Sequence, residues 1–339
     1  MCSSRKPSTD WRDLTRREMD TYHHLVKPTV VVIVPTWNRV ADLPRCLGAL
    51  ARQTSPPDRV ILAGKESDQA LRESFERLAS DAGGLKVDLV LASHDANVVR
   101  QQNAALDETT EDIVALTDDD AEPELDWIER MLGHFKSAAV GGVGGRDWQP
   151  IERGNKSRVG MLSWYGRVTG NHHLGCGPTR TVHILKGVNC AFRGTALRKI
   201  RFDERMRGTG TVINWELAVS FAFLREGYRL IYDPAVSVKH HISDRKDGDT
   251  NQRGIFESES YFNNTYNEVL AISEHLSPVR RIAYSIWSEM VGTVGNPGIA
   301  QLFRTWIYSR YPRLSAWPRY CTAASARRMA RKDRQKSLI

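Results

Sequence analysis

The chain has 339 residues, of which 41% are hydrophobic and 26% charged, and 48 Lys and Arg against 40 Asp and Glu give a formal net charge of +8. The apolar content excludes an intrinsically disordered chain, and the modest numbers of Gly and Pro exclude a collagen-like or low-complexity one. At about 150 residues per domain, the length predicts one large domain with additions, or two domains, with a core large enough for an enzyme site.

Basic residues collect at the two ends of the chain, within residues 1–20 and 327–339. Such ends suit an anionic membrane surface or a polyanion, and they also occur as solvated tails. The five cysteines are widely spaced and lack the paired spacing of a zinc site, which predicts reduced thiols in a cytosolic protein. The polar residues 1–28 contain no apolar stretch of signal-peptide length, and they predict one short helix over residues 11–25.

Short apolar runs, mostly of β-branched residues, predict strands that are buried on both faces. These runs are residues 30–34, 60–63, 87–91 and 113–116. Apolar residues at helical spacing predict helices over residues 43–50, 71–78 and 128–135. Strands that alternate with helices make a parallel sheet, and ligands bind beyond the carboxyl ends of such strands.

The second half of the chain has a different pattern. The glycine-rich residues 141–145 predict a flexible stretch, and the chain up to Gly177 is expected to be irregular. Regular structure is expected again over residues 182–185. Helices are predicted over residues 195–200 and 215–226, and strands over residues 230–232 and 236–240. A polar loop follows over residues 243–254. The interrupted apolar residues 282–303 predict helices that lie on a membrane surface and do not cross it.

Three consecutive carboxylates, Asp118, Asp119 and Asp120, follow the fourth predicted strand. Alternation along an extended backbone turns Asp118 and Asp120 to the same side, where their like charges repel one another. A divalent cation relieves such repulsion and can also hold a diphosphate. In the competing interpretation one Asp caps the helix that begins after Pro123, but a cap accounts for one carboxylate and not for three. The pattern therefore favours a metal site.

The chain contains an ordered series of short motifs, which begins at the first predicted strand. The first strand runs into Pro35-Thr36-Trp37-Asn38-Arg39, and the three Asp are followed by Pro123 and by Asp126-Trp127-Ile128. The later motifs are Gly187-Val188-Asn189-Cys190-Ala191-Phe192-Arg193, Phe202-Asp203-Glu204, Gly227-Tyr228-Arg229, Tyr232-Asp233-Pro234 and His240. In this order the motifs resemble those of the family 2 glycosyltransferases. The resemblance covers residues 29–242, and the order of the motifs is more specific than any one of them.

This resemblance implies an α/β protein with a GT-A (Rossmann-like) fold, in which helices flank a mixed, mostly parallel sheet. It also implies an inverting glycosyltransferase that uses a nucleotide-sugar donor, a divalent cation (Mn²⁺ or Mg²⁺) and a glycan or lipid-linked acceptor. A cation can stabilise the charge that develops on the departing diphosphate. The residues implied in donor binding are Pro35, Thr36, Trp37, Arg39, Arg100, Asp118 and Asp119, and those implied in cation binding are Asp118, Asp120 and His240.

An inverting transfer also needs a general base that takes the proton from the acceptor hydroxyl. In the family an acid at the start of the helix before the Gly-Tyr-Arg segment has this role. An ungapped count back from Gly227 places Glu216 at that position. Alternatively, Glu216 is an ordinary first-turn acid favoured by the helix dipole, and Asp203 or Glu204 is the base.

The chain departs from the family pattern at three positions. Gly64 lies where the second strand usually ends in an acidic pair, Gln102 replaces an Arg, and Trp215 replaces the first acid of the catalytic pair. These departures leave the nucleotide preference open, and they imply that one diphosphate contact is either missing or supplied by Arg100. The resemblance further implies that Asn189 and Trp215 contact the acceptor.

These patterns predict a polar extension over residues 1–28, a GT-A domain over 29–242, a mobile loop and helix over 243–275, and amphipathic basic helices over 276–339. The last segment mixes aromatic and basic residues, which predicts a cytoplasmic protein bound peripherally to the inner face of the cell membrane. The same segment could instead pack on its own domain or form a homodimer.

Two other functions stay open at this point. One is a catalytically impaired GT-A-like module that binds sugar. The other is a nucleotidyltransferase, although this class normally has a glycine-rich phosphate loop after the first strand, and residues 35–39 do not form one. We expect no nucleic-acid partner, because the basic residues collect in the tails and no binding motif is present.

Overall fold

A computed structural model describes residues 27–149, 157–241, 256–308 and 316–336. The helix predicted over residues 11–25 and the loop predicted over 243–254 lie outside these described residues. The elements up to the middle of the chain are β1 (Val30–Pro35), α2 (Leu43–Ala51), β2 (Arg59–Lys65), α3 (Gln69–Ser80), β3 (Val87–Ala92), α4 (Val98–Asp107), β4 (Ile113–Leu116), β5 (Ala121–Pro123), α5 (Trp127–Phe135) and β6 (Val140–Trp148). The later elements are β7 (Met161–Leu162), β8 (Val168–Thr169), β9 (Arg180–Val182), β10 (Cys190–Arg193), α6 (Gly194–Ile200), α7 (Trp215–Arg225), β11 (Arg229–His240), α8 (Ser258–His275), α9 (Pro278–Met290), α10 (Ile299–Tyr308) and α11 (Ala316–Lys336).

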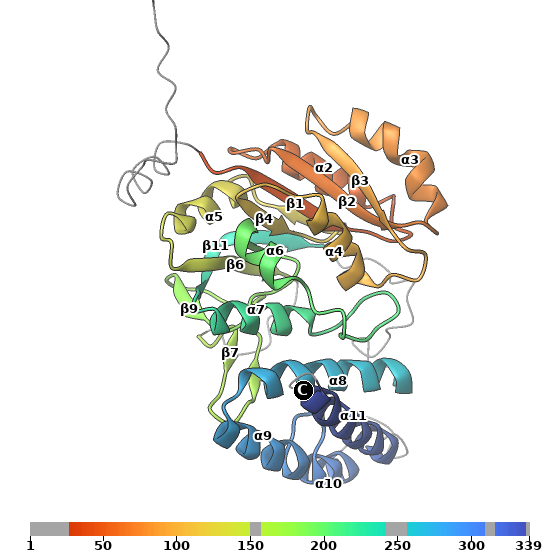
Figure 1. The fold of residues 1–339 in the computed structure, drawn as a ribbon, viewed down its shortest axis with the longest axis vertical. Coiled ribbons are helices and arrows are strands. Elements are labelled where there is room, and N and C mark those ends of the chain that lie inside the picture. Colours follow the sequence, from red (N-terminus) through yellow and green to blue (C-terminus); the bar gives the residue numbers. More distant parts are fainter. Residues whose placement is uncertain (1–26, 150–156, 242–255, 309–315, 337–339) are drawn as a thin grey trace, which may run out of the picture.

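The strands build a mixed nine-stranded sheet in the order β3-β2-β1-β4-β10-β6-β11-β5, with β9 also paired to β11. Strands β3, β2, β1 and β4 run parallel to one another. Strand β10 is antiparallel to both its neighbours, and β6 and β11 are parallel. The predicted α/β class with a mostly parallel sheet and flanking helices is confirmed (Figure 1).

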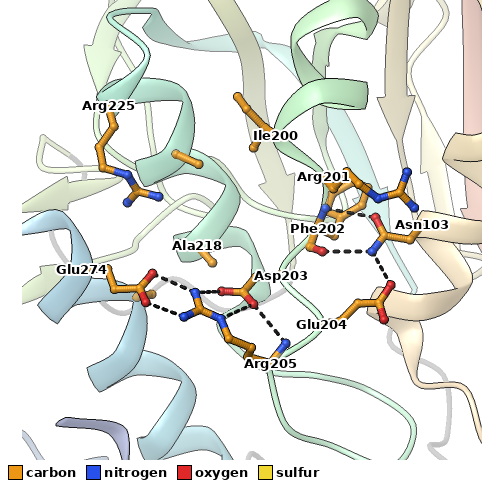
Figure 2. Close-up of a pocket in the computed structure, with 12 residues that line it drawn as sticks. Asn103, Ile200, Arg201, Phe202, Asp203, Glu204, Arg205, Ala218, Arg225 and Glu274 are labelled. Carbon is orange, nitrogen blue, oxygen red and sulfur yellow. Dashed lines mark hydrogen bonds and ion pairs between the residues drawn. The ribbon is translucent and has the colours of Figure 1, made fainter. Parts of the chain in front are cut away.

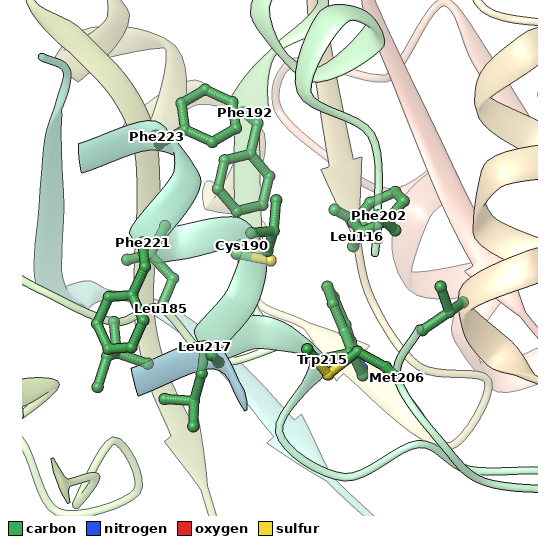
Figure 3. Close-up of a cluster of buried hydrophobic side chains, with 14 of the residues drawn as sticks. Leu116, Leu185, Cys190, Phe192, Phe202, Met206, Trp215, Leu217, Phe221 and Phe223 are labelled. Carbon is green, nitrogen blue, oxygen red and sulfur yellow. The ribbon is translucent and has the colours of Figure 1, made fainter. Parts of the chain in front are cut away.

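Both faces of the sheet are covered, and β1 shows how one strand serves both. Val31 and Ile33 belong to a cluster that includes side chains of α4, α7 and α8, whereas Val32 belongs to a cluster under α2, α3 and α5. Figure 3 shows part of the first cluster, in which Phe192 of β10 stacks on Phe223 of α7 with 4.8 Å between ring centroids. Burial on both faces explains why the strands appear in the sequence as continuous apolar runs.

Residues 141–145 are the middle of strand β6, so the predicted flexible stretch is wrong. A Cβ atom on Gly145 would lie 1.7 Å from the backbone oxygen of Val236, and one on Gly144 would lie 2.7 Å from that of Asn189. Only glycine allows the chain to approach the strand this closely. Here the glycines therefore mark close packing against a buried strand.

Other boundaries also differ from the sequence patterns. Helix α4 was not predicted, because its buried positions include the amides Gln101, Gln102 and Asn103 and so lack a clear apolar stripe. Strand β9 ends at Val182, at the start of residues 182–185, where regular structure was expected. The two strands predicted over 230–232 and 236–240 are one strand, β11, whose pairing with β6 is irregular in between.

The C-terminal helices lie on the α7 side of the sheet. Helix α8 packs against α7 and α11, and α9 and α10 lie at the end of the molecule farthest from the sheet (Figure 1). Among the described residues, no helix combines the length and apolar character that a membrane span requires. The predicted divisions at residues 28, 242 and 275 remain predictions.

Candidate active site

Asp118, Asp120 and His240 meet beyond the carboxyl end of β4, and we call these three residues the cation cluster. Antiparallel pairing of β5 with β11 sets His240 opposite Ala121, and the N–H of His241 donates to the backbone oxygen of Asp120 at 2.9 Å. One ligand atom from each member of the cluster lies within 4.8 Å of the others. Two carboxylates and an imidazole offer oxygen and nitrogen ligands, and this donor set fits a divalent cation such as Mn²⁺.

The cation cluster has an excess of negative charge. The Nε2 atom of His240 lies 3.2 Å from Asp120, and its Nδ1 atom lies 3.1 Å from Asp147. Burial lowers the pKa of His240, but the hydrogen bonds to Asp120 and Asp147 outweigh burial and raise this pKa to about 10. Burial and then the charge of Asp120 raise the pKa of Asp118, against the opposing effect of His240. A positive charge is therefore favourable at this position.

Asp147, which the sequence patterns missed, holds the histidine in place. It lies near the end of β6, where β6 pairs with the part of β11 that carries His240. Burial raises the pKa of Asp147, but the hydrogen bond and charge of His240 outweigh burial and lower the pKa below its ordinary value. A carboxylate on one ring nitrogen fixes the orientation of the other, as at many metal-binding histidines. Only the strand register brings the two residues together, and the sequence carried no signal for it.

Asp119 contacts the end of β1. Its Oδ2 atom accepts a hydrogen bond from the Thr36 hydroxyl at 2.8 Å, and its Oδ1 atom pairs with Arg39 at 2.9 Å. Arg39 also reaches Asp120 at 3.2 Å. Burial raises the pKa of Asp119 to about 7, although Arg39 opposes this shift. These predicted donor-site residues do come together, and their polar contacts join the ends of β1 and β4.

Trp37 lies under a lysine that sequence reasoning also missed. The Nζ atom of Lys65, the last residue of β2, lies 3.8 Å from the centre of the Trp37 ring and 3.3 Å from the backbone oxygen of Thr209. An ammonium group over an indole ring is a favourable cation–π contact. Pro35, the last residue of β1, is half-buried and lies two residues before Trp37 in the sequence. The end of β2 therefore carries a positive group, Lys65, directly after Gly64, where the family usually has an acidic pair.

Arg100 and Gln102 lie on α4 with opposite exposure. The side chain of Arg100 is 47% exposed, and its nearest acidic partners, Glu204 and Asp95, are 3.8 and 3.9 Å away. Gln102 is buried. Such long, exposed ion pairs hold an arginine only weakly. Arg100 can therefore contact a ligand, whereas Gln102 belongs to the packing of α4.

Glu216 lies in the first turn of α7 and pairs with Lys186. Its Oε1 atom is 3.2 Å from the Lys186 Nζ atom, and only 15% of the Glu216 side chain is exposed. The charge of Glu216 is the main cause that raises the pKa of Lys186, and the charges of Asp147 and Asp118 act in the same direction. Lys186 thus links the candidate base electrostatically to the acids around the cation cluster. The sequence patterns had not singled out Lys186.

Asn189 and Trp215, which were expected at the acceptor, are buried. The Asn189 amide accepts a hydrogen bond from Trp127 at 2.8 Å and donates to backbone oxygens of β6 and β11 at 3.0 and 2.9 Å. The Trp215 ring packs edge-on against Phe202, with 5.3 Å between the ring centroids. Both side chains therefore lie within the protein, and their expected contact with the acceptor stays a prediction.

Asp203 and Glu204, the alternative bases, line a separate cavity of about 410 Å³ among α6, α7 and α8 (Figure 2). Asp203 pairs with Arg205 at 2.6 Å, and Arg205 also pairs with Glu274 at 2.7 Å. Glu204 accepts a hydrogen bond from Asn103 at 2.9 Å. The described residues that line this cavity include neither the cation cluster nor the acid of α7. The geometry therefore favours Glu216 as the base.

Comparisons with known proteins agree with this arrangement. The family model described as glycosyl transferase family 2 matches residues 31–201, half of the chain. The chain is 26% identical over 213 residues to the pre-mycofactocin glycosyltransferase of Mycobacterium tuberculosis, a match that covers 62% of this chain and 42% of that protein. It is 29% identical over 129 residues to the glucosyl-dolichyl phosphate glucuronosyltransferase of Haloferax volcanii, which covers 36% of this chain and 40% of that protein. The chain thus spans about two fifths of the length of these curated relatives.

A solved structure shares the fold. The mannosyltransferase PcManGT from Pyrobaculum calidifontis, in complex with GDP-Man and Mn²⁺, superposes with a TM-score of 0.56 at 17% identity. The superposition covers 89% of this chain and 88% of that one. At this identity the likeness concerns the fold alone.

Proposed function

The chain belongs to glycosyl transferase family 2, and from this membership we propose that it moves a sugar from a nucleotide-sugar donor to a hydroxyl group of a glycan or lipid-linked acceptor. The transfer inverts the anomeric carbon and depends on a divalent cation. One observation carries the proposal: the cation cluster, in which carboxylates outnumber the histidine, is coupled through Lys186 to a carboxylate at a helix start.

The cation cluster is the proposed cation site. A cation held by Asp118, Asp120 and His240 would offset the negative charge that develops on the departing nucleoside diphosphate. Asp147 binds the Nδ1 atom of His240, so that the Nε2 atom stays directed at Asp120. The contacts of Asp119 with the end of β1 keep the backbone after β4 in one conformation.

Glu216 is the proposed general base. Its carboxylate takes the proton of the acceptor hydroxyl as that oxygen attacks the anomeric carbon, on the face opposite the departing diphosphate. One new carbon–oxygen bond forms while the bond to the diphosphate breaks, which inverts the configuration. Lys186 holds the Glu216 carboxylate in place through their 3.2 Å contact.

The ends of β1 and β2 are the proposed seat of the nucleoside. Trp37 offers a flat aromatic surface, Lys65 offers a donor group for a carbonyl of the base, and Arg100 is free enough to reach the diphosphate. Support for a lipid-linked acceptor comes from the name of the Haloferax volcanii relative, which specifies a glucosyl-dolichyl phosphate. With such an acceptor the enzyme works peripherally at a membrane surface. A homodimer stays a prediction.

A substitution at the base tests this function. We expect Glu216→Gln to lower the transfer rate by about 10²- to 10⁴-fold, the usual contribution of a general base, without weakening donor binding. Release of UDP or GDP from a panel of nucleotide sugars with Mn²⁺ and acceptors measures the rate, and calorimetry measures donor binding. The matched control Glu259→Gln removes an exposed first-turn carboxylate from α8 and should keep the full rate.

Two results would contradict the proposal. A full transfer rate in Glu216→Gln would show that another group takes the proton. Donor binding by the unmodified chain without transfer to any acceptor would favour the sugar-binding module.

A further inference from the structure

We propose that the outer face of α9 and α10, together with Trp164 of the β7–β8 hairpin, inserts into an anionic lipid bilayer. This surface goes beyond the donor chemistry and is built from residues remote from the cation cluster. We call it the insertion face, and its members are Trp164, Val279, Ile282, Ile286, Met290, Val294, Phe303 and Ile307.

Helix α9 presents its apolar stripe away from the protein. Val279, Ile282, Ile286 and Met290 are 70, 63, 60 and 53% exposed, and their spacing of three and four residues puts them on one side of the helix. Tyr284, on the opposite side, is fully buried. A helix of a water-soluble domain normally buries its apolar stripe. An apolar stripe of this kind that faces outward indicates a binding surface.

The hairpin between β7 and β8 extends this face. Arg280 on α9 donates to the backbone oxygen of Trp164 at 2.9 Å, and the Tyr165 ring lies 5.2 Å from that of Trp287. Gly166 has a φ of +85°, and a Cβ atom there would lie 2.4 Å from the Tyr284 ring. These contacts fix the hairpin against α9 and hold Trp164, which is 63% exposed, beside the start of the stripe. An aromatic residue at this position suits the interface between water and lipid.

Charge makes the face complementary to anionic lipid. Residues 276–339 contain twelve Lys and Arg and only two acids, Glu289 and Asp333. Glu289 pairs with Arg327 and Arg331, and Asp333 accepts a hydrogen bond from Tyr266. Both acids are therefore engaged within the helical bundle. Amphipathic helices with an apolar stripe and basic flanks bind at the surface of anionic bilayers.

The same charge argues against a second copy of the chain as the occupant. A symmetric pair buries the same patch of both subunits. Two such faces, each with an exposed basic residue such as Arg304 next to Phe303 on α10, would then oppose like charges. An anionic lipid surface offers apolar chains and negative headgroups together, so it satisfies both features of the insertion face.

One member of the insertion face, Trp164, lies in the same chain segment as Lys186 of the candidate active site. The β7–β8 hairpin belongs to the segment between β6 and β10, and this segment reaches Lys186 beside Glu216 before β10 begins. Figure 1 shows the hairpin extending from the sheet towards α9. Insertion would bring the enzyme to a bilayer that can carry the proposed lipid-linked acceptor, a consequence that rests on the proposed function.

Flotation of the full chain with vesicles tests the proposal. The probes are vesicles of phosphatidylcholine alone and vesicles with about 30% phosphatidylglycerol, in about 0.1 M and about 0.5 M NaCl. We expect binding to the anionic vesicles, weakened by salt, and at least a tenfold loss of binding in Ile282→Asp/Ile286→Asp. The matched control Leu125→Asp changes a side chain that is also apolar and exposed, at 57%, next to β5, and it should bind as the unmodified chain does.

Each other outcome overturns the proposal. Equal flotation of the double variant and the unmodified chain would mean that the face does not insert. If the unmodified chain fails to float but sediments as a dimer that the double variant disrupts, the face joins two copies. Unfolding curves of the double variant check that it folds, which we expect because both side chains are exposed.

A parallel assay separates this surface from the proposed function. Hydrolysis of nucleotide sugar with Mn²⁺, measured without vesicles, should be the same in the double variant as in the unmodified chain. Hydrolysis without vesicle binding would overturn the insertion face alone, and vesicle binding without hydrolysis or transfer would overturn the function alone.

Discussion

Two groups of buried charge, one at the end of the sheet and one among the C-terminal helices, differ in their balance. At the sheet end, the carboxylates of residues 118–120 and of Asp147 share the positive charges of Arg39 and His240. The acids outnumber their partners, and burial raises the pKa of Asp118 and Asp119.

Among the C-terminal helices the charges are matched, because two arginines, Arg327 and Arg331, face two carboxyl groups, Glu289 and Glu268. The side chain of Arg327 is fully buried, donates to Asn296 at 2.8 Å and pairs with Glu289 at 3.0 Å. Arg331 pairs with the same acid at 2.9 Å. A matched group of this kind joins helices, whereas an unmatched group of acids is suited to bind a cation. The predictions below test this distinction.

We expect the largest effect from the matched group. Arg327→Met should lower the free energy of unfolding by about 3 kcal/mol, because it removes one partner of a buried ion pair and leaves polar groups of α9 and its following turn without a donor. Urea denaturation measures the change. Arg328→Met is a matched control at an exposed neighbour and should change stability little. Equal stability of the two variants would show that the buried pair does not hold the helices.

Replacing an acid of the unmatched group should raise the stability of the protein and lower its transfer activity. Asp118→Asn removes a carboxylate that burial and Asp120 disfavour. We therefore expect the free energy of unfolding without metal to rise by about 1 kcal/mol, as at other functional sites that are relieved of strain. The transfer rate with Mn²⁺ should fall by about 10²- to 10³-fold, the scale of a lost electrostatic contact to the transition state. Unchanged transfer, or a loss of stability, would contradict the assignment.

The last prediction is a pH dependence at Glu268 on α8. Burial raises the pKa of this carboxyl group from 4.5 to about 7, against a hydrogen bond to Asn296 and the charge of Arg327. Because the folded state holds this proton more tightly than the unfolded state, its contribution to stability is full below about pH 4.5 and is lost as the pH rises through about 7.

Because Glu268→Gln removes the titrating group, the free energy of unfolding of this variant should fall less steeply over this pH range. The free energy of unfolding at about pH 5 and about pH 8, measured for both proteins, checks it. An equal slope in the two proteins would place the titrating group elsewhere.

Much of the sheet and part of the site could be predicted from the sequence. Runs such as residues 30–34 are apolar at every position because helices cover both faces of the sheet, so the strands were recognisable. Asp118 and Asp120 are two residues apart, and local backbone geometry is enough to bring them together. His240 became a candidate through its place in the motif series, and the pairing of β5 with β11 brings it to the acids.

Other features depend on strand register and packing, which the sequence patterns did not contain. Asp147 reaches His240 only because β6 pairs with β11, and Lys186 reaches Glu216 from a turn about thirty residues earlier. The glycines of β6 suggested flexibility because the sequence does not show the chain that packs against them. Asn189 had the expected polar side chain, but three internal hydrogen bonds occupy it.

The central claim is that the unmatched acids at the sheet end form a cation-dependent site for a nucleotide sugar. Calorimetric titration of UDP and GDP into the unmodified chain, with Mn²⁺ and then with a chelator, tests this claim most directly. We predict binding of at least one nucleotide with Mn²⁺, and a loss of that binding of at least tenfold in the chelator. Equal binding under both conditions, or no binding of either nucleotide, would contradict it.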